Sequence, residues 1–86
     1  MNNSPAFRIL VVDDEPEIRR FLRATLNAQH HEVIEAVNGS EALTRLRMAQ
    51  PDLLILDLGL PDIDGIEVTR RVRGWSRIPI IILSVR

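Results

Sequence analysis

Three aspartates follow short apolar runs in this sequence, at a spacing that could build a metal site. Residues 9–12 are branched aliphatics that run directly into Asp13 and Asp14, and residues 53–56 run into Asp57. Short aliphatic runs bounded by polar residues are typical of parallel strands buried on both faces. Ligand sites of open α/β sheets lie beyond the carboxyl ends of the strands, so we expect the three carboxylates to meet there. Because neighbouring carboxylates repel one another, a hard divalent cation such as Mg²⁺ would stabilise this cluster.

The rest of the sequence alternates strand-like runs with helical patterns. This alternation predicts an α/β fold with a parallel sheet and right-handed crossovers. Strands are expected at residues 8–12, 32–36, 52–56 and 80–83, and helices from Pro16 to about Gln29, from Ser40 to Gln50 and from Asp64 to about Arg73.

Polar residues mark the starts of the expected helices. Ser40 follows a turn and is expected to cap the second helix, and Asp64 with Glu67 is expected to form a capping pair at the third. The three-four spacing of the first helix predicts one buried and one solvated face. The buried face comprises Ile18, Phe21, Leu22, Thr25 and Leu26, and the solvated face Arg19, Arg20 and Arg23.

Length and composition indicate one small domain. The 86 residues are 45% hydrophobic, and no apolar stretch approaches the ~20 residues of a membrane-spanning helix. Cysteine is absent and all eleven basic residues are arginine, which excludes disulfides, thiolate ligands and lysine chemistry. The net charge of -1 and the lack of a targeting segment predict a cytoplasmic protein whose residues 1–86 contact neither nucleic acid nor membrane.

Three motifs resemble those of the receiver domain of two-component response regulators. They are ILVVDDE at residues 9–15, LILDLGLPDIDG at residues 54–65 and IIILS at residues 80–84. The resemblance begins at about Arg8 and implies the doubly wound, flavodoxin- or CheY-like fold with strand order 2-1-3-4-5. Within the family, the sequence is most similar to the KdpE-type regulators of potassium-transport genes, in the OmpR/PhoB winged-helix class.

The resemblance implies a role for each polar residue at the carboxyl edge of the sheet. Asp57 matches the phosphoacceptor, which receives a phosphoryl group from a sensor histidine kinase. Asp14 and Asp13 match the carboxylates of the Mg²⁺ site, and Gly59 matches the residue whose backbone carbonyl binds the metal. Ser84 matches the hydroxyl that contacts the phosphoryl group. The implied protein is a switch rather than an enzyme, and it controls transcription through a DNA-binding domain outside residues 1–86.

The sequence departs from the family pattern at its C-terminal end. Receivers have a lysine after the fifth strand, and this sequence contains neither that strand nor any lysine. We therefore expect residues 1–86 to be the N-terminal two-thirds of one receiver domain, with residues 1–7 as a flexible lead-in. Its strand order would be 2-1-3-4, with the fifth strand and last helices missing. An uncovered fourth strand would favour a homodimer or a strand-exchanged assembly.

Two other functions stay open on the residues alone. A haloacid-dehalogenase-type phosphatase also uses a strand-end aspartate and Mg²⁺, but its motif needs a second aspartate where this sequence has Gly59. Asp62 and Asp64 form an Asp-x-Asp pattern in a loop and are interpreted as turn and cap residues. The other alternative is a non-catalytic assembly module in which the acidic edge is idle.

Overall fold

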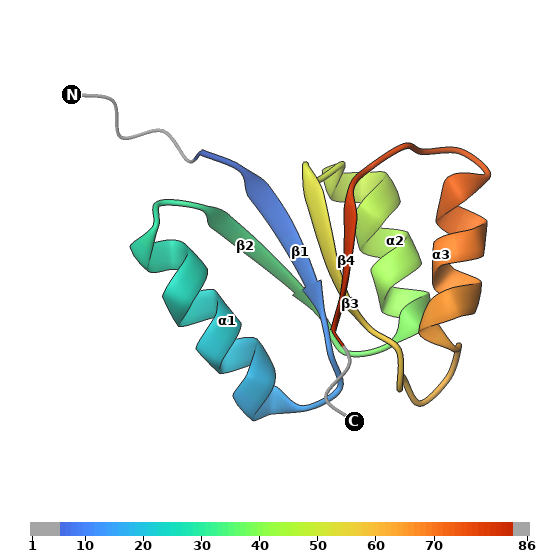
Figure 1. Cartoon of the computed structure of the whole chain (residues 1–86), viewed down its shortest axis with the longest axis horizontal. Coiled ribbons are helices and arrows are strands. Elements are labelled where there is room, and N and C mark those ends of the chain that lie inside the picture. The colour runs from blue at the N-terminus through green and yellow to red at the C-terminus, as the bar shows by residue number, and fades with distance from the viewer. Residues whose placement is uncertain (1–5, 84–86) are drawn as a thin grey trace.

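A computed structural model describes residues 6–83, which form a parallel sheet flanked by helices (Figure 1). The strands are β1 (Arg8–Val12), β2 (Glu32–Ala36), β3 (Leu53–Asp57) and β4 (Ile80–Leu83), and the helices are α1 (Pro16–Ala28), α2 (Gly39–Ala49) and α3 (Gly65–Arg73). The strands are all parallel and lie in the order β2-β1-β3-β4, which confirms the predicted doubly wound topology. The lead-in predicted for residues 1–7 falls mostly on residues 1–5, outside the described range.

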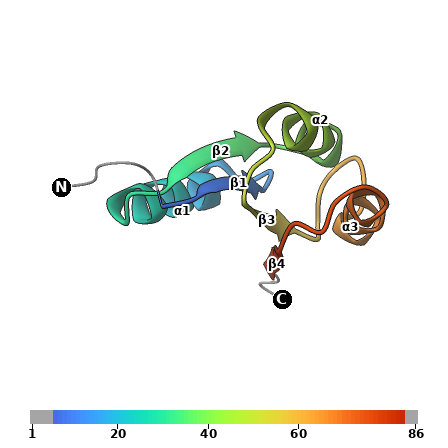
Figure 2. The ribbon, with the colours of Figure 1, turned by 90° about the horizontal axis from the view of Figure 1, so that it is seen from above.

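The sheet separates two apolar clusters, because side chains of successive strand residues point to opposite faces. α2 and α3 lie together on one side of the sheet and α1 lies on the other (Figures 1 and 2). The larger cluster fills the α2–α3 side and the smaller one fills the α1 side. Their buried strand members are Leu10, Val12, Ala36, Leu54 and Leu56 in the first, and Ile9, Val11 and Ile55 in the second. No helix in residues 6–83 is long and apolar enough to cross a membrane.

The buried face of α1 is narrower than its sequence predicted. Ile18, Leu22 and Leu26 are half-buried, but Phe21 is 66% exposed and Thr25 is also exposed. α1 contacts β1 and β2, and only Leu22 and Leu26 from the helix reach the cluster beneath it. The prediction was wrong for Phe21 and Thr25 because, within residues 6–83, α1 is the one helix on this side of the sheet and buries only a thin stripe.

Arg19 is the second departure on α1. It was predicted to be solvated, but its side chain is half-buried, and its Nε pairs with Glu35 Oε1 at 3.2 Å. Its Nη1 donates to the backbone carbonyl of Asp13 at 2.7 Å. Arg19 therefore ties the start of α1 to the residue that follows β1.

The N-cap of α2 is Asn38 rather than the predicted Ser40. The Asn38 Oδ1 accepts the Glu41 N–H at 2.8 Å, while Glu41 Oε1 accepts the Val37 N–H at 3.2 Å. This arrangement resembles a capping box, except that Glu41 accepts the N–H of Val37, the residue before the N-cap, and not that of Asn38 itself. The prediction was wrong because the helix begins at Gly39, so that Ser40 already lies in its first turn.

Asp64 is the N-cap of α3, as predicted, and its Oδ1 accepts the Ile66 N–H at 2.7 Å. Glu67 does not complete the expected capping pair. Its carboxylate binds Arg70 and Arg71 on the next turn of the helix. Two arginines at the i+3 and i+4 positions offer this carboxylate more charge than the Asp64 N–H does.

Candidate metal centre

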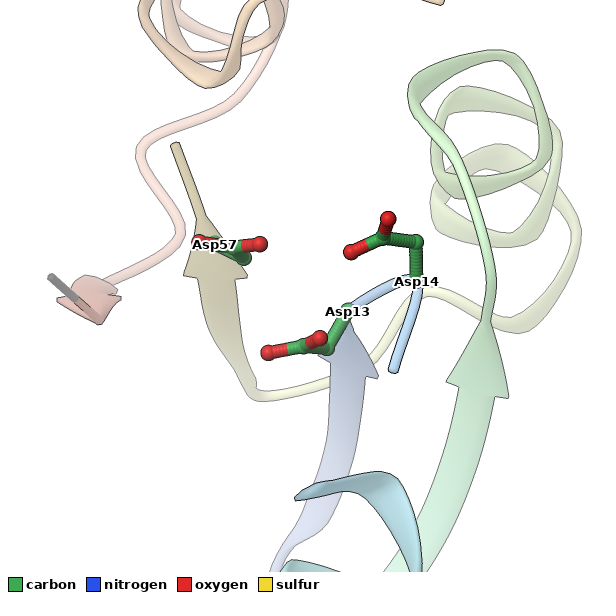
Figure 3. Close-up of side chains that lie close together, drawn as sticks. All are labelled: Asp13, Asp14 and Asp57. Carbon is green, nitrogen blue, oxygen red and sulfur yellow. The ribbon is translucent and has the colours of Figure 1, made fainter. Parts of the chain in front are cut away.

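Three carboxylates meet at the carboxyl ends of β1 and β3, as the sequence predicted. Asp13 and Asp57 come from neighbouring strands, since Val12 pairs in register with Leu56. One carboxylate oxygen from each of Asp13, Asp14 and Asp57 lies within 4.8 Å of the other two. The carboxylates of Asp14 and Asp57 point toward one another (Figure 3).

Asp13 is the buried member of the cluster, with 4% of its surface exposed. Burial raises the pKa of the Asp13 carboxyl, and the negative charges of Asp57, Glu15 and Asp14 raise it further. The Glu15 N–H, which donates to Asp13 Oδ1 at 2.8 Å, acts in the opposite direction and lowers it. The site therefore holds a carboxylate whose negative charge lacks full compensation from the protein, and a bound cation would supply it.

Asp14 and Asp57 give solvent access to this site, because Asp14 is exposed and Asp57 is half-buried. The Asp57 Oδ1 accepts the Gly59 N–H at 3.3 Å, so the side chain is held by the turn that follows β3. Gly59 itself is exposed in this turn. A ligand can therefore approach Asp57 from solvent, whereas Asp13 is buried.

Ser84, the predicted hydroxyl contact, lies outside the described residues. Its neighbour Leu83 pairs in register with Asp57 across β3 and β4. The strand that leads to Ser84 therefore ends beside the strand that carries Asp57.

The donor set fits a small hard cation. Mg²⁺ prefers oxygen ligands at ~2.0–2.1 Å, so two ligands on opposite sides of the ion are about 4 Å apart. The separations of up to 4.8 Å among Asp13, Asp14 and Asp57 are close to this span. All three ligands are carboxylates. These hard oxygen donors favour Mg²⁺ over softer metals.

Two contacts near the site were not predicted from the sequence. The bond from Arg19 to the backbone carbonyl of Asp13 was not expected, because the arginine lies among others on a helix. The bonds that Asp62 accepts from amides of α2 were not expected either, because Asp62 was interpreted as a turn residue. Each contact joins two different elements of the fold, so no local sequence pattern predicts it.

Comparison with known proteins defines the class. Residues 9–86 match the response regulator receiver domain family, and the chain belongs to that family. It is 50% identical over 78 residues to the KDP operon transcriptional regulatory protein KdpE of Escherichia coli, and 44% identical over 86 residues to the transcriptional regulatory protein ResD of Bacillus subtilis. These matches cover 91% and 100% of this chain, but only 35% and 36% of the two relatives.

Solved structures agree with the family assignment. The chemotaxis response regulator CheY4 of Vibrio cholerae matches with a TM-score of 0.88 and 34% identity, over 92% of this chain and 68% of that one. A chain from the complex of the histidine kinase ThkA with the response regulator protein TrrA matches with a TM-score of 0.83 and 43% identity, over 91% and 68%. The predicted receiver fold and its KdpE-type resemblance are thus confirmed.

The two alternative functions gain no support from these comparisons. In the structure, the Asp-x-Asp pattern does not form a second acidic site, since the Asp64 carboxylate accepts an amide of α3 and the Asp62 carboxylate accepts amides of α2. Asp64 is the cap residue that the sequence predicted, whereas Asp62 joins its loop to α2 and is more than a local turn residue.

Proposed function

We propose that this chain is a Mg²⁺-dependent phosphoacceptor switch, in which Asp57 receives a phosphoryl group from a sensor histidine kinase. The observation that carries the proposal is the convergence of Asp13, Asp14 and Asp57 within 4.8 Å at the carboxyl edge of the sheet, in a chain of the receiver family. Receiver domains are phosphoacceptor switches rather than enzymes with a separate substrate.

The proposed reaction is an in-line displacement at phosphorus. A carboxylate oxygen of Asp57 forms a bond to the phosphorus of a phosphohistidine while the phosphorus–nitrogen bond breaks. The electron pair of that bond stays on the imidazole nitrogen of the kinase, and the product is an acyl phosphate on Asp57. When bound, Mg²⁺ neutralises negative charge on the phosphoryl oxygens.

The other residues of the edge orient the acceptor and hold the ion. Asp14 and Asp13 would bind the cation together with Asp57, and Gly59 would contribute its backbone carbonyl. The Gly59 N–H at 3.3 Å from Asp57 Oδ1 restrains the nucleophile and leaves its second oxygen free for attack. Ser84, the residue that follows β4 in the sequence, would donate its hydroxyl to the phosphoryl group.

The relatives support a phosphoryl donor and an output domain. The similarity to a chain of the ThkA–TrrA complex supports a sensor histidine kinase as the phosphoryl donor. The names of KdpE and ResD as transcriptional regulatory proteins support control of transcription through a DNA-binding domain outside these residues. The proposed function therefore includes a histidine kinase as donor, a DNA-binding domain as output and a cytoplasmic location.

The test uses acetyl phosphate or beryllofluoride with Mg²⁺ on the 86-residue chain. We expect mass spectrometry after acetyl phosphate treatment to find one phosphoryl group on Asp57, and amide NMR to show beryllofluoride shifts at residues 57–59. Chelation of Mg²⁺ and the Asp57→Asn variant should each abolish both signals. A folded chain that takes up neither reagent would overturn the proposal.

A further inference from the structure

The loop between β3 and α3, residues 58–64, is anchored to a different helix by one side chain. Asp62 Oδ1 accepts the Gly39 N–H at 2.7 Å, and Asp62 Oδ2 accepts the Ser40 N–H at 2.9 Å. Gly39 and Ser40 are the first two residues of α2. Helix N-terminal amides have no partner within the helix and lie at the positive end of its dipole, which favours a carboxylate there.

The amides at the start of α2 are therefore satisfied from two sources. Asn38 accepts the Glu41 N–H at 2.8 Å from within the helix start, and Asp62 accepts the two preceding amides from 22 and 23 residues away. Burial raises the pKa of Asp62, but the hydrogen bonds from Gly39 and Ser40, together with the backbone amides of Ile63 and of Asp62 itself, outweigh this and keep the pKa below the ordinary value. The bridging group is thus an ionised carboxylate at neutral pH.

The packing around this bridge allows the loop little freedom. A Cβ on Gly39 would lie 2.8 Å from the Ile63 Cβ, so the loop tip rests directly against the start of α2. At its base, the Gly65 N–H donates to the Leu58 carbonyl at 3.1 Å. The loop is fixed at both ends, and the turn that contains Gly59 lies between them.

We propose that Asp62 is a positioning residue, which holds the Leu58–Gly59 backbone at the acidic cluster by bridging the β3–α3 loop to the first turn of α2. This inference rests on the proposed function, because Gly59 is the residue whose carbonyl would bind the ion. Asp62 itself does not belong to the cluster of Asp13, Asp14 and Asp57. Its effect on metal binding passes through the backbone.

The experiment compares Asp62→Ala and Asp62→Asn with Asp64→Asn in the 86-residue chain. Asp64→Asn removes an equal charge from the same loop, keeps an oxygen that can accept the Ile66 N–H, and leaves the bridge intact. Asp62→Asn keeps the size of the side chain and one acceptor oxygen, so it should retain part of the bridge. Urea denaturation establishes that each variant is folded.

The metal-dependent measurement is a Mg²⁺ titration followed by the amide shifts of residues 57–59. Trp75 lies beyond the opposite end of α3 and is a poor reporter. We expect Asp62→Ala to weaken Mg²⁺ binding about tenfold, the low end of the range for residues that support metal ligands. Asp62→Asn should be intermediate, and Asp64→Asn should change the dissociation constant less than about twofold. Equal losses in Asp62→Ala and Asp64→Asn would show a charge effect alone and overturn the inference.

The metal-free measurement is hydrogen exchange of the Gly65 amide, which depends on the loop base and not on Mg²⁺. We expect Asp62→Ala to exchange faster than Asp64→Asn at this amide, after correction for global stability. If the parent chain binds no Mg²⁺, the proposed function fails while this comparison still decides whether Asp62 anchors the loop. Unchanged protection in Asp62→Ala would overturn the anchoring itself.

Discussion

Asp13 and Asp57 leave neighbouring parallel strands one residue after the register pair Val12 and Leu56, and their carboxylate oxygens lie within 4.8 Å of each other. The strand pairing alone forces two negative charges together at the edge of the sheet. The protein counters this only in part, with the Glu15 N–H on Asp13 and the Gly59 N–H on Asp57. The acidic edge is therefore expected to lower the free energy of unfolding when no cation is present. It is also expected to bind a cation.

The first prediction concerns the charge of Asp13. Asp13→Asn should raise the free energy of unfolding of the metal-free chain by roughly 1 kcal/mol, the interaction of unit charges about 4 Å apart in a water-like dielectric. Asn keeps an oxygen that can accept the Glu15 N–H. Urea denaturation with and without Mg²⁺ measures this, and the variant should lose most of the stabilisation that Mg²⁺ gives the parent chain. The matched control Glu17→Gln removes an exposed charge from the first turn of α1, so it should lower the free energy of unfolding slightly and leave the stabilisation by Mg²⁺ nearly unchanged.

The second prediction is the pH dependence of that effect. Because burial raises the pKa of Asp13 above 3.8 in the folded chain, the folded state holds this proton more tightly than the unfolded state. The stabilisation that comes from protonated Asp13 is therefore complete below the pKa of Asp13 in the unfolded chain. It is lost as pH rises through the higher pKa of Asp13 in the folded chain. In metal-free buffer, the stability difference between Asp13→Asn and the parent chain should grow from acid to neutral pH. A difference that stays constant across this range would contradict the assignment.

The third prediction uses the opposite shift at Glu67. Side-chain hydrogen bonds from Arg70 and Arg71 lower the Glu67 pKa to about 2 from 4.5. Its contribution to stability is present above 4.5 and is lost as pH falls through about 2. Thermal unfolding of Glu67→Gln should therefore differ most from the parent chain near neutral pH and converge with it in strong acid. The difference should also shrink at about 1 M salt, because this cluster is solvent-exposed.

The fourth prediction tests the close approach of α3 to β3. A Cβ on Gly65 would lie 2.7 Å from the Asp57 carbonyl oxygen and 2.8 Å from the Leu58 Cα. Gly65→Ala should lower the free energy of unfolding by ~1–3 kcal/mol, the usual cost of overpacking, and should weaken Mg²⁺ binding because Asp57 must shift. Gly74→Ala is the control, since its Cβ would meet only the Arg71 carbonyl, at 3.2 Å. Equal stability of the two variants in urea would contradict the predicted crowding.

The fifth prediction concerns β4, which pairs only with β3 among the described strands. Ile81 and Ile82 on this strand are 48% and 41% exposed. An outer strand with apolar side chains favours pairing with a second copy, so the 86-residue chain should show a concentration-dependent dimer by light scattering. Ile81→Lys should shift it to the monomer, whereas Met48→Lys, on the 82% exposed Met48 of α2, should not. A monomeric parent chain at high concentration would refute the homodimer or strand-exchanged assembly.

The sequence by itself determined the strands and the acidic edge. The predicted strand at residues 32–36 coincides with β2, and the one predicted at 52–56 is displaced by a single residue from β3. The prediction at 52–56 succeeded because a parallel strand buried on both faces is a continuous apolar run, and the acidic edge was predictable because parallel strands place their carboxyl ends at one edge. The meeting of Asp13, Asp14 and Asp57 follows from that geometry.

Only the tertiary structure decided which side chains join separate elements. The bridge from Asp62 to α2, the contact of Arg19 with the Asp13 carbonyl and the exposure of Phe21 all depend on how loops and helices pack against the sheet. Helical periodicity identifies an apolar stripe but not how much of it a neighbouring element covers. From sequence alone, a carboxylate in a loop could accept hydrogen bonds from any of several amides. Only the fold shows which amides lie within reach. Local pattern therefore located the acidic site, and long-range packing set what surrounds it.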